Sequence, residues 1–359
     1  MSLFENQLNS KLFSCLTIDV EDWFHILDSP AAPSIERWSS LESRIERNLE
    51  MLLEVLDSLS VKATFFWLGW LAERHKDLVR KCQKAGHEIA SHGYSHVLVY
   101  EVGEKLFRQD IIRSKAILED IIGEAVIGFR SAGFGITQET PWALNAIMES
   151  GFLYDSSIFP ASHGHGGILN SPFKPFFVET QSGYLLEVPL SAIDIFGWRT
   201  SFFGGGHLRA ANKLMIKWGI DKLQASGRPL VVYIHPREID PDHPRLPLNL
   251  LRRFKCYVNL KSTLPKLKWL CEHYSFYTML GMIENYIRSF YLERKTIPIV
   301  HLQSSHAASE PSPTLSEQTS VASSEASRSR HLAVDKAVAN FLSPGILRSH
   351  RSSQYKAQG

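Results

Sequence analysis

The most constraining feature of this sequence is an alternation of short apolar segments with longer amphipathic ones. Seven short segments are rich in β-branched and aromatic residues, as buried strands are: 12–18, 61–69, 87–91, 125–129, 152–154, 184–190 and 229–234. Between them, segments such as 41–59 place leucine and isoleucine on one helical face. The alternation predicts an α/β fold with a parallel sheet, and at this length it favours a closed or nearly closed barrel.

Composition narrows the class of protein. The chain has 359 residues and a formal net charge of +2. This charge is too small to indicate a positive electrostatic field that would attract nucleic acid. The four cysteines form no C-x-x-C pair, and we interpret them as reduced thiols. No signal peptide is recognised, and no apolar run reaches the roughly 18 residues of a membrane-spanning helix. We therefore expect a cytoplasmic protein.

The chain changes character near its end. Beyond residue 302 it is rich in Ser, Ala, Pro and Glu and nearly free of large apolar residues, which predicts disorder. A weak helical patch follows at 331–342. The predicted organisation is an N-terminal lead over 1–11, a catalytic barrel over 12–240, an extension packed on the barrel over 241–285, and a Ser-rich, largely disordered tail over 286–359.

Ionisable residues follow five of the predicted strands. In chain order they are Asp19, Glu21 and Asp22, then His92 and His96, then Arg130, then Asp155, and finally His235. The carboxyl ends of parallel strands meet at one end of a barrel, where active sites are built. This convergence predicts a metal-assisted hydrolase.

The residue types suit that chemistry. Two imidazoles four residues apart on a helical turn can face one cation, and a carboxylate completes a three-ligand site that leaves room for water. A second carboxylate can take a proton from that water, and a histidine opposite can protonate the leaving amine. An arginine beside the base would keep it ionised and oriented.

Each group also has a plainer explanation. Acidic residues after a strand often cap the next helix, and a lone His-x-x-x-His pair is more often not a metal site. Arg130 could be a surface residue and His235 a turn residue. All these explanations would have to hold together at one end of the barrel, so we favour the catalytic interpretation.

Five motifs together resemble those of the polysaccharide deacetylases, the carbohydrate esterase family related to chitooligosaccharide deacetylases. They are TIDVEDW at 17–23, SHGYSH at 91–96, FRSAGFG at 129–135, YDSS at 154–157 and YIHP at 233–236. The resemblance covers about residues 12–283 and includes SFFGGGHLRA at 201–210, which is similar to a branch found with exopolysaccharide and exosortase gene clusters. It implies a distorted (β/α)7 barrel.

The resemblance also implies residue roles. Asp19 would be the general base, held by Arg130, and His235 the general acid, tuned by Asp155. His92 and His96 would bind a divalent metal, most simply Zn²⁺. The family has two adjacent aspartates where this chain has Asp19 and Val20, so the third ligand is either Glu21 or Asp22. Strand alternation puts Glu21 on the face of Asp19, whereas a turn at the strand end would bring in Asp22.

Other residues are expected around the substrate. By the same resemblance, the backbone N–H of Gly133 or Phe134 would help to stabilise the oxyanion. Trp23 and Trp198 are the predicted sugar platforms. His163 and His165 are expected to be flexible surface residues, and the glycines at 204–206 to form a tight loop at the rim of the site.

The leading hypothesis is an N-deacetylase that acts on N-acetylated amino sugars of a bacterial exopolysaccharide. Its expected partners are that polysaccharide or its oligosaccharides and the exopolysaccharide synthesis machinery. One alternative is an allantoinase-like hydrolase of a small cyclic amide or ureide. A glycosidase with paired carboxylates would leave the histidine pair unexplained. The non-enzymatic alternative is a degenerate carbohydrate-binding barrel.

Overall fold

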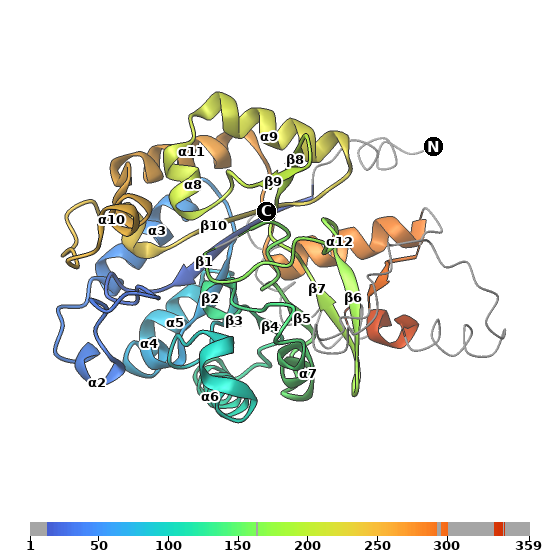
Figure 1. Ribbon diagram of the computed structural model, residues 1–359, viewed down its shortest axis with the longest axis horizontal. Helices are drawn as coiled ribbons and strands as arrows, with labels where there is room; N and C mark the ends of the chain where they lie inside the picture. The colour runs from blue at the N-terminus through green and yellow to red at the C-terminus, as the bar shows by residue number, and fades with distance from the viewer. Residues whose placement is uncertain (1–12, 163, 293–295, 301–333, 340, 342–359) are drawn as a thin grey trace.

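The main sheet contains the seven strands predicted from the sequence, all parallel to one another. The computed structural model describes residues 13–162, 164–292, 296–300, 334–339 and 341 (Figure 1). In spatial order the seven strands are β10 (Leu230–Ile234), β1 (Ser14–Val20), β2 (Thr64–Trp67), β3 (Glu88–Ser91), β4 (Gly128–Phe129), β5 (Tyr154–Asp155) and β7 (Gly183–Glu187). The predicted parallel α/β fold is therefore confirmed.

Four further strands were not predicted. Strand β6 (Phe176–Thr180) pairs antiparallel with β7, and β11 (Ile299–Val300) pairs parallel with β6. Strands β8 (Ile193–Ile195) and β9 (Trp198–Thr200) form a separate hairpin. Over the described residues the sheet begins at β10 and ends at β11, so strand pairing does not close the ring and the barrel is distorted.

Helices connect and cover the strands. They are α2 (Ile35–Trp38), α3 (Ile45–Ser58), α4 (Gly69–Arg74), α5 (Lys76–Lys84), α6 (Val99–Ile122), α7 (Trp142–Glu149), α8 (Gly205–Ala210), α9 (Lys213–Ala225), α10 (Leu250–Tyr257), α11 (Thr263–His273) and α12 (Met279–Leu292). The sequence predicts one helix through 71–86, but α4 and α5 are separate. The break lies at His75, whose φ of −122° and ψ of 46° are not helical.

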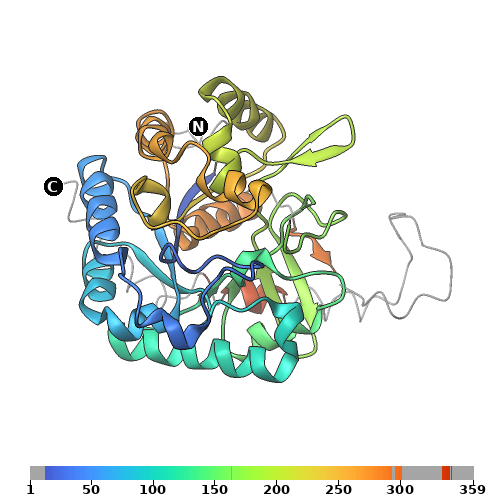
Figure 2. The same cartoon turned by 60° about the vertical axis from the view of Figure 1, so that its left-hand side comes forward.

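Alternation along the strands divides the core into two compartments. Cys15, Phe66 and Tyr233 belong to a cluster inside the barrel. Leu16 and Phe65, one residue away along their strands, belong to the larger cluster between the sheet and its outer helices, which surround it in Figure 2. Because successive side chains point to opposite faces of a strand, each strand contributes to both compartments.

The N-terminal end of the barrel is closed by the start of α12. The backbone N–H of Tyr277 donates to Ser14 O at 2.9 Å, and that of Met279 donates to Thr64 Oγ1 at 2.6 Å. Ser14 and Thr64 are the first residues of β1 and β2. The opposite end, where the carboxyl ends of the strands lie, is left for a site.

The C-terminal region differs from the predicted organisation in where its last long helix ends. The boundary expected between 285 and 286 falls inside α12, which continues to Leu292 because its apolar residues pack into the barrel interior. Most of the predicted disordered tail lies outside the described residues, although 334–339 are helical, within the predicted patch. In the part of the chain that the structure describes, no helix combines the length and the apolarity needed to cross a bilayer.

Candidate active site

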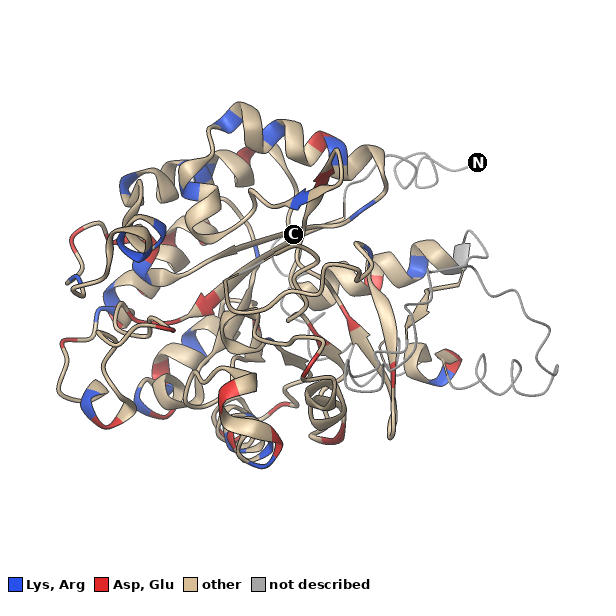
Figure 3. Cartoon of the chain, in the orientation of Figure 1, with Lys and Arg blue, Asp and Glu red and all other residues tan. Residues whose placement is uncertain are grey.

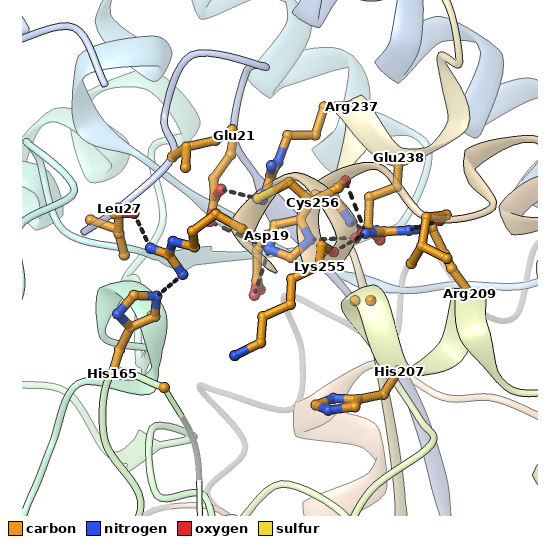
Figure 4. Close-up of a pocket in the computed structure, with 18 of the residues that line it drawn as sticks. Asp19, Glu21, Leu27, His165, His207, Arg209, Arg237, Glu238, Lys255 and Cys256 are labelled. Atoms are coloured by element: carbon orange, nitrogen blue, oxygen red, sulfur yellow. Dashed lines mark hydrogen bonds and ion pairs between the residues drawn. The ribbon is translucent and has the colours of Figure 1, made fainter. Parts of the chain in front are cut away.

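Four of the predicted reactive residues line one cleft at the carboxyl ends of the strands (Figure 4). Asp19, Glu21, His96 and His235 all line it, and its volume is about 400 Å³. A cavity of this size is typical of sites for small molecules or single sugar residues. Gly205 and Gly206, two of the glycines predicted to form a tight loop at the rim, do line the cleft, but they are the first residues of helix α8.

Glu21, His92 and His96 form a cluster suited to a divalent cation. One ligand atom from each lies within 4.8 Å of the others, and all three residues are buried. Nε2 of His92 and Nε2 of His96 lie 3.3 and 3.0 Å from Glu21 Oε1. Nδ1 of His92 is 2.8 Å from Arg130 O and donates to it, which directs the Nε2 lone pair at the cluster. Burial lowers the pKa of His96, so its imidazole is neutral, as a metal ligand must be.

Asp22 does not join this cluster, and its proposed role as a ligand is corrected. Its carboxylate accepts hydrogen bonds from Trp23 N at 2.8 Å, Ser43 Oγ at 2.6 Å and Arg44 N at 3.0 Å. Ser43 and Arg44 immediately precede α3, so Asp22 fixes the segment that starts this helix. Strand alternation was the better guide, since it places Glu21 on the same side as Asp19.

The two histidines converge through a loop and not through the helical turn expected from their spacing. Gly93 and His96 have φ angles of 77° and 52°, in the left-handed region. Asp110 on α6 fixes the loop by accepting hydrogen bonds from Tyr94 N at 2.7 Å and Ser95 N at 3.0 Å. A Cβ on Gly93 would lie 2.7 Å from Asp110 Oδ2, so glycine is required there.

Asp19, the predicted base, is held by Arg130, as predicted. Arg130 donates from NH1 to Asp19 Oδ1 at 2.7 Å. Both side chains are buried, with exposed fractions of 0% and 2%. Arg130 also donates to Ser156 O at 3.1 Å and to Thr17 Oγ1 at 2.8 Å, so the guanidinium is fixed on several sides. Asp19 Oδ2 is left facing His235, whose Nε2 is 4.0 Å away.

His235, the predicted acid, lies between carboxylates. Its Nε2 is 3.5 Å from Glu21 Oε1 and its Nδ1 is 3.4 Å from Glu238 Oε1. Burial opposes the charged imidazole, but Glu21 and Glu238 raise the pKa of His235 to about 10. Glu238 is in turn paired with the buried Arg209 of α8, which also donates to Val258 O at 2.9 Å and Lys255 O at 2.7 Å.

Asp155 does not contact His235, and its predicted tuning role is corrected. It lies beside Glu187, its partner across the β5–β7 pairing, and accepts from Ser157 Oγ at 2.6 Å. Burial raises the pKa of both carboxyl groups, and the negative charge of Asp155 raises that of Glu187 further. The two carboxyl groups of Asp155 and Glu187 therefore interact with each other across the strands, and Glu238 occupies the position beside His235.

The predicted substrate contacts are only partly placed at the cleft. Gly133 and Phe134 line it, but the N–H of Phe134 already donates to Ser131 O at 3.1 Å inside a 3₁₀ turn, Ala132–Phe134. Phe134 is thus a poor oxyanion donor. Trp23 is 6% exposed and donates from Nε1 to Glu42 O, so no face of its ring is open to a sugar.

The second predicted sugar platform, Trp198, and the loop histidine His165 lie in different surroundings. Trp198 is 81% exposed on β9. His165 lines the cleft and lies 3.2 Å from Arg252 NH1, which corrects its assignment as a flexible surface residue. His163 lies outside the described residues.

Sequence reasoning missed three residues of this site: Arg209 and Glu238, which are buried, and Arg237, which is half-buried. Arg237 NH2 is 3.6 Å from Glu21 Oε2. Glu238 follows His235 by three residues and its carboxylate accepts from His235 N, the spacing of a capping box. That spacing was the available signal, whereas nothing in the local pattern around Arg209 indicates that it is buried.

Two family models match the chain over most of its barrel. Residues 40–148 match the model described as Polysaccharide deacetylase. The chain carries a polysaccharide deacetylase domain. Residues 156–284 match a second model, described as Domain of unknown function (DUF3473). The cleft is shared between the two matches, because His92, His96 and Arg130 belong to the first, and His235 and Glu238 to the second.

Curated relatives of this deacetylase domain carry related names. A peptidoglycan-N-acetylglucosamine deacetylase of Bacillus cereus is 40% identical over 22% of this chain and 30% of its own length. A peptidoglycan deacetylase of Helicobacter pylori is 24% identical over 37% of this chain and 41% of its length. A chitooligosaccharide deacetylase of Azorhizobium caulinodans is 29% identical over 23% of this chain and 39% of its length. The chain thus spans well under half the length of each.

Solved structures show the same fold at low identity. A probable polysaccharide deacetylase from Pseudomonas aeruginosa superposes with a TM-score of 0.50 at 17% identity, covering 77% of this chain and 90% of that one. An allantoinase superposes with a TM-score of 0.51 at 18% identity over the same shares. The fold alone therefore does not separate the deacetylase domain from small-ureide hydrolases.

Proposed function

We propose that this chain is a metal-dependent hydrolase that removes N-acetyl groups from amino sugars of a bacterial exopolysaccharide. One observation carries the proposal: a buried N₂O cluster, an arginine-held aspartate and a carboxylate-held histidine line the same cleft. The names of the sequence relatives support the N-acetylated sugar as substrate. A role beside the exopolysaccharide synthesis machinery belongs to the same proposal.

The proposed metal ligands are Glu21, His92 and His96. Their two imidazole nitrogens and one carboxylate oxygen are a donor set that catalytic zinc uses, and the His92 Nδ1 hydrogen bond to Arg130 O fixes the required tautomer. Without a cation, the clustered lone pairs would repel. A bound divalent ion, Zn²⁺ in our proposal, would polarise the acetyl carbonyl and lower the pKa of a water molecule.

Asp19 is the proposed general base. Its Oδ1 is occupied by Arg130, so Oδ2, on the side of His235, is the oxygen available to take the proton of the attacking water. The ion pair fixes the carboxylate within the cleft, so no reorientation is needed when the water is deprotonated.

His235 is the proposed general acid, and Glu238 is the residue proposed to orient it. An imidazole held protonated by neighbouring carboxylates can deliver the Nε2 proton to the leaving amine. Glu238 Oε1 lies 3.4 Å from Nδ1, an ion-pair contact on the side away from Nε2, and Arg209 is paired with Glu238 in turn. Asp19 and His235 would thus divide the two proton transfers, one from the attacking water and one to the leaving amine.

The test is acetate release from a panel of N-acetylated oligosaccharides, with allantoin as the small-ureide competitor. We expect acetate from the sugars, loss of activity with a chelator, and recovery on adding Zn²⁺. Asp19→Asn should abolish turnover while circular dichroism and metal content stay unchanged. Asp120→Asn, the same change on the exposed face of α6, is the matched control. Metal-loaded protein that hydrolyses allantoin and no N-acetylated sugar would overturn the proposal.

A further inference from the structure

The carboxylates at the floor of the cleft are paired with basic side chains, whereas the cations at its mouth have no buried carboxylate beside them. Each floor carboxylate has a basic partner: Asp19 with Arg130, Glu238 with Arg209, and Glu21 with Arg237 and the two histidines. At the mouth, Arg252 lies 3.7 Å from Asp28, a carboxylate that is itself 62% exposed. The mouth therefore carries positive charge that no buried carboxylate offsets.

Lys255 is the principal unmatched cation. It lies on α10, is exposed, and lines the cleft. Figure 4 shows its side chain extending into the cleft, toward the side where His207 lies. Over the described residues no carboxylate oxygen lies within 4.0 Å of its Nζ. Burial is the largest cause of the lowered pKa of His207, and the positive charge of Lys255 is the second. The Lys255 ammonium therefore lies near the His207 imidazole.

The same helix offers apolar surface beside this charge. Leu251 and Phe254 also line the cleft, with 65% and 59% of their surface exposed. Figure 3 shows basic residues on α10. In the sequence of this helix they are Arg252, Arg253 and Lys255. An apolar wall that bears one unmatched cation fits a ring with C–H faces and an anionic substituent.

We propose that α10 forms a subsite for an anionic sugar residue, so that the preferred substrate is a glycan with an acidic group next to the N-acetylated sugar. This inference rests on the proposed function and names its substrate class. The Lys255 ammonium binds the anion as a point charge, which suits a uronate carboxylate or a sugar phosphate alike. Leu251 and Phe254 cover the ring.

Equilibrium binding tests the subsite without relying on turnover. Calorimetry would compare three ligands: a glucuronate–N-acetylglucosamine tetrasaccharide, the neutral N-acetylglucosamine tetramer, and UDP-N-acetylglucosamine. We expect wild type to bind at least one anionic ligand more tightly than the neutral tetramer. Lys255→Met should weaken anionic binding by about three- to fivefold, the upper range for a partly exposed ion pair, and leave the neutral tetramer unchanged.

Arg253→Met is the matched control, because it removes one positive charge from the same helix at an exposed residue that does not line the cleft. It should leave all three affinities unchanged, and Phe254→Ala should lower affinity for both tetrasaccharides. The anion whose binding weakens in Lys255→Met identifies carboxylate or phosphate as the source.

Several results would overturn the subsite. They are a wild type that binds none of the ligands or prefers the neutral one, an equal loss for neutral and anionic ligands in Lys255→Met, and an effect of Arg253→Met as large as that of Lys255→Met. Anionic preference without acetate release from any sugar would instead leave the subsite standing and remove the proposed deacetylase function.

Discussion

Glu238 and Asp155 offer a direct test of which carboxylate supports His235. We expect Glu238→Gln to lower kcat for acetate release by about 100-fold with little change in KM, because the acid acts after the substrate is bound. Unit charges 3.4 Å apart interact by about 5 kcal/mol at an effective dielectric constant of 20. A charge-assisted hydrogen bond retains about 1.5–3 kcal/mol of this, or roughly 10–150-fold in rate.

Asp155→Asn should leave kcat close to the wild-type value. Burial raises the pKa of its carboxyl group and so disfavours the charged form, which makes a neutral amide a small change at this position. Both variants change one carboxylate to an amide in a fully buried place, which makes them a matched pair.

Stability has to be separated from catalysis in this comparison. Glu238→Gln leaves Arg209 buried without its carboxylate, which should cost about 3 kcal/mol of unfolding free energy. Rates are therefore expressed per folded, metal-loaded molecule, with the folded fraction from circular dichroism and the metal from elemental analysis. A fall in kcat for Asp155→Asn that equals or exceeds the fall for Glu238→Gln would refute the assignment.

Three further outcomes are expected. Glu21→Gln should lose bound metal in elemental analysis, whereas Asp22→Asn should keep it and lose about 1 kcal/mol in urea unfolding, as expected for a weakened helix start. Burial lowers the pKa of His87 to about 3, so its stabilising contribution is full above pH 6.5 and is lost as pH falls toward 3. At pH 5 the loss is about 2 kcal/mol. His87→Asn keeps an acceptor for the Ala63 N–H and should unfold with a shallower pH dependence; an unchanged slope would contradict this. Gly128→Ala should lower the melting temperature, since its Cβ would lie 2.1 Å from Tyr154 Oη and overpacking costs about 1–3 kcal/mol; an unshifted transition would count against it.

The parallel strands, and the polar residues that directly follow them, were predictable because buried parallel strands have a strongly apolar composition. Strand β10 is buried throughout and ends at Ile234, directly before His235, so both its type and the position of the histidine could be inferred. The antiparallel β6, by contrast, ends in half-buried polar residues and resembles a loop. Strand β6 is held in the sheet by backbone pairing with β7 and β11, which its composition does not report.

Within the site, residues on strand ends were predictable and residues held by tertiary contacts were not. Asp19 and Glu21 follow from alternation along β1. Asp155 follows its strand equally well, yet pairing with Glu187 turns it away from His235. That choice depends on the register of β5 against β7, about 30 residues apart, which local patterns do not encode.

The closing of the barrel floor by α12 has a consequence for how the protein is made. Strand β1 carries the proposed base, but it pairs with β10 more than 200 residues later, and Ser14 accepts from Tyr277. During synthesis one edge of β1 can pair early with β2, but its other edge waits for nearly all of the described barrel to leave the ribosome. Contacts this distant in sequence slow folding and leave one edge of the apolar β1 unpaired meanwhile, which favours aggregation of the incomplete chain. The same delay means that a nascent or truncated chain ending before residue 277 should be catalytically silent.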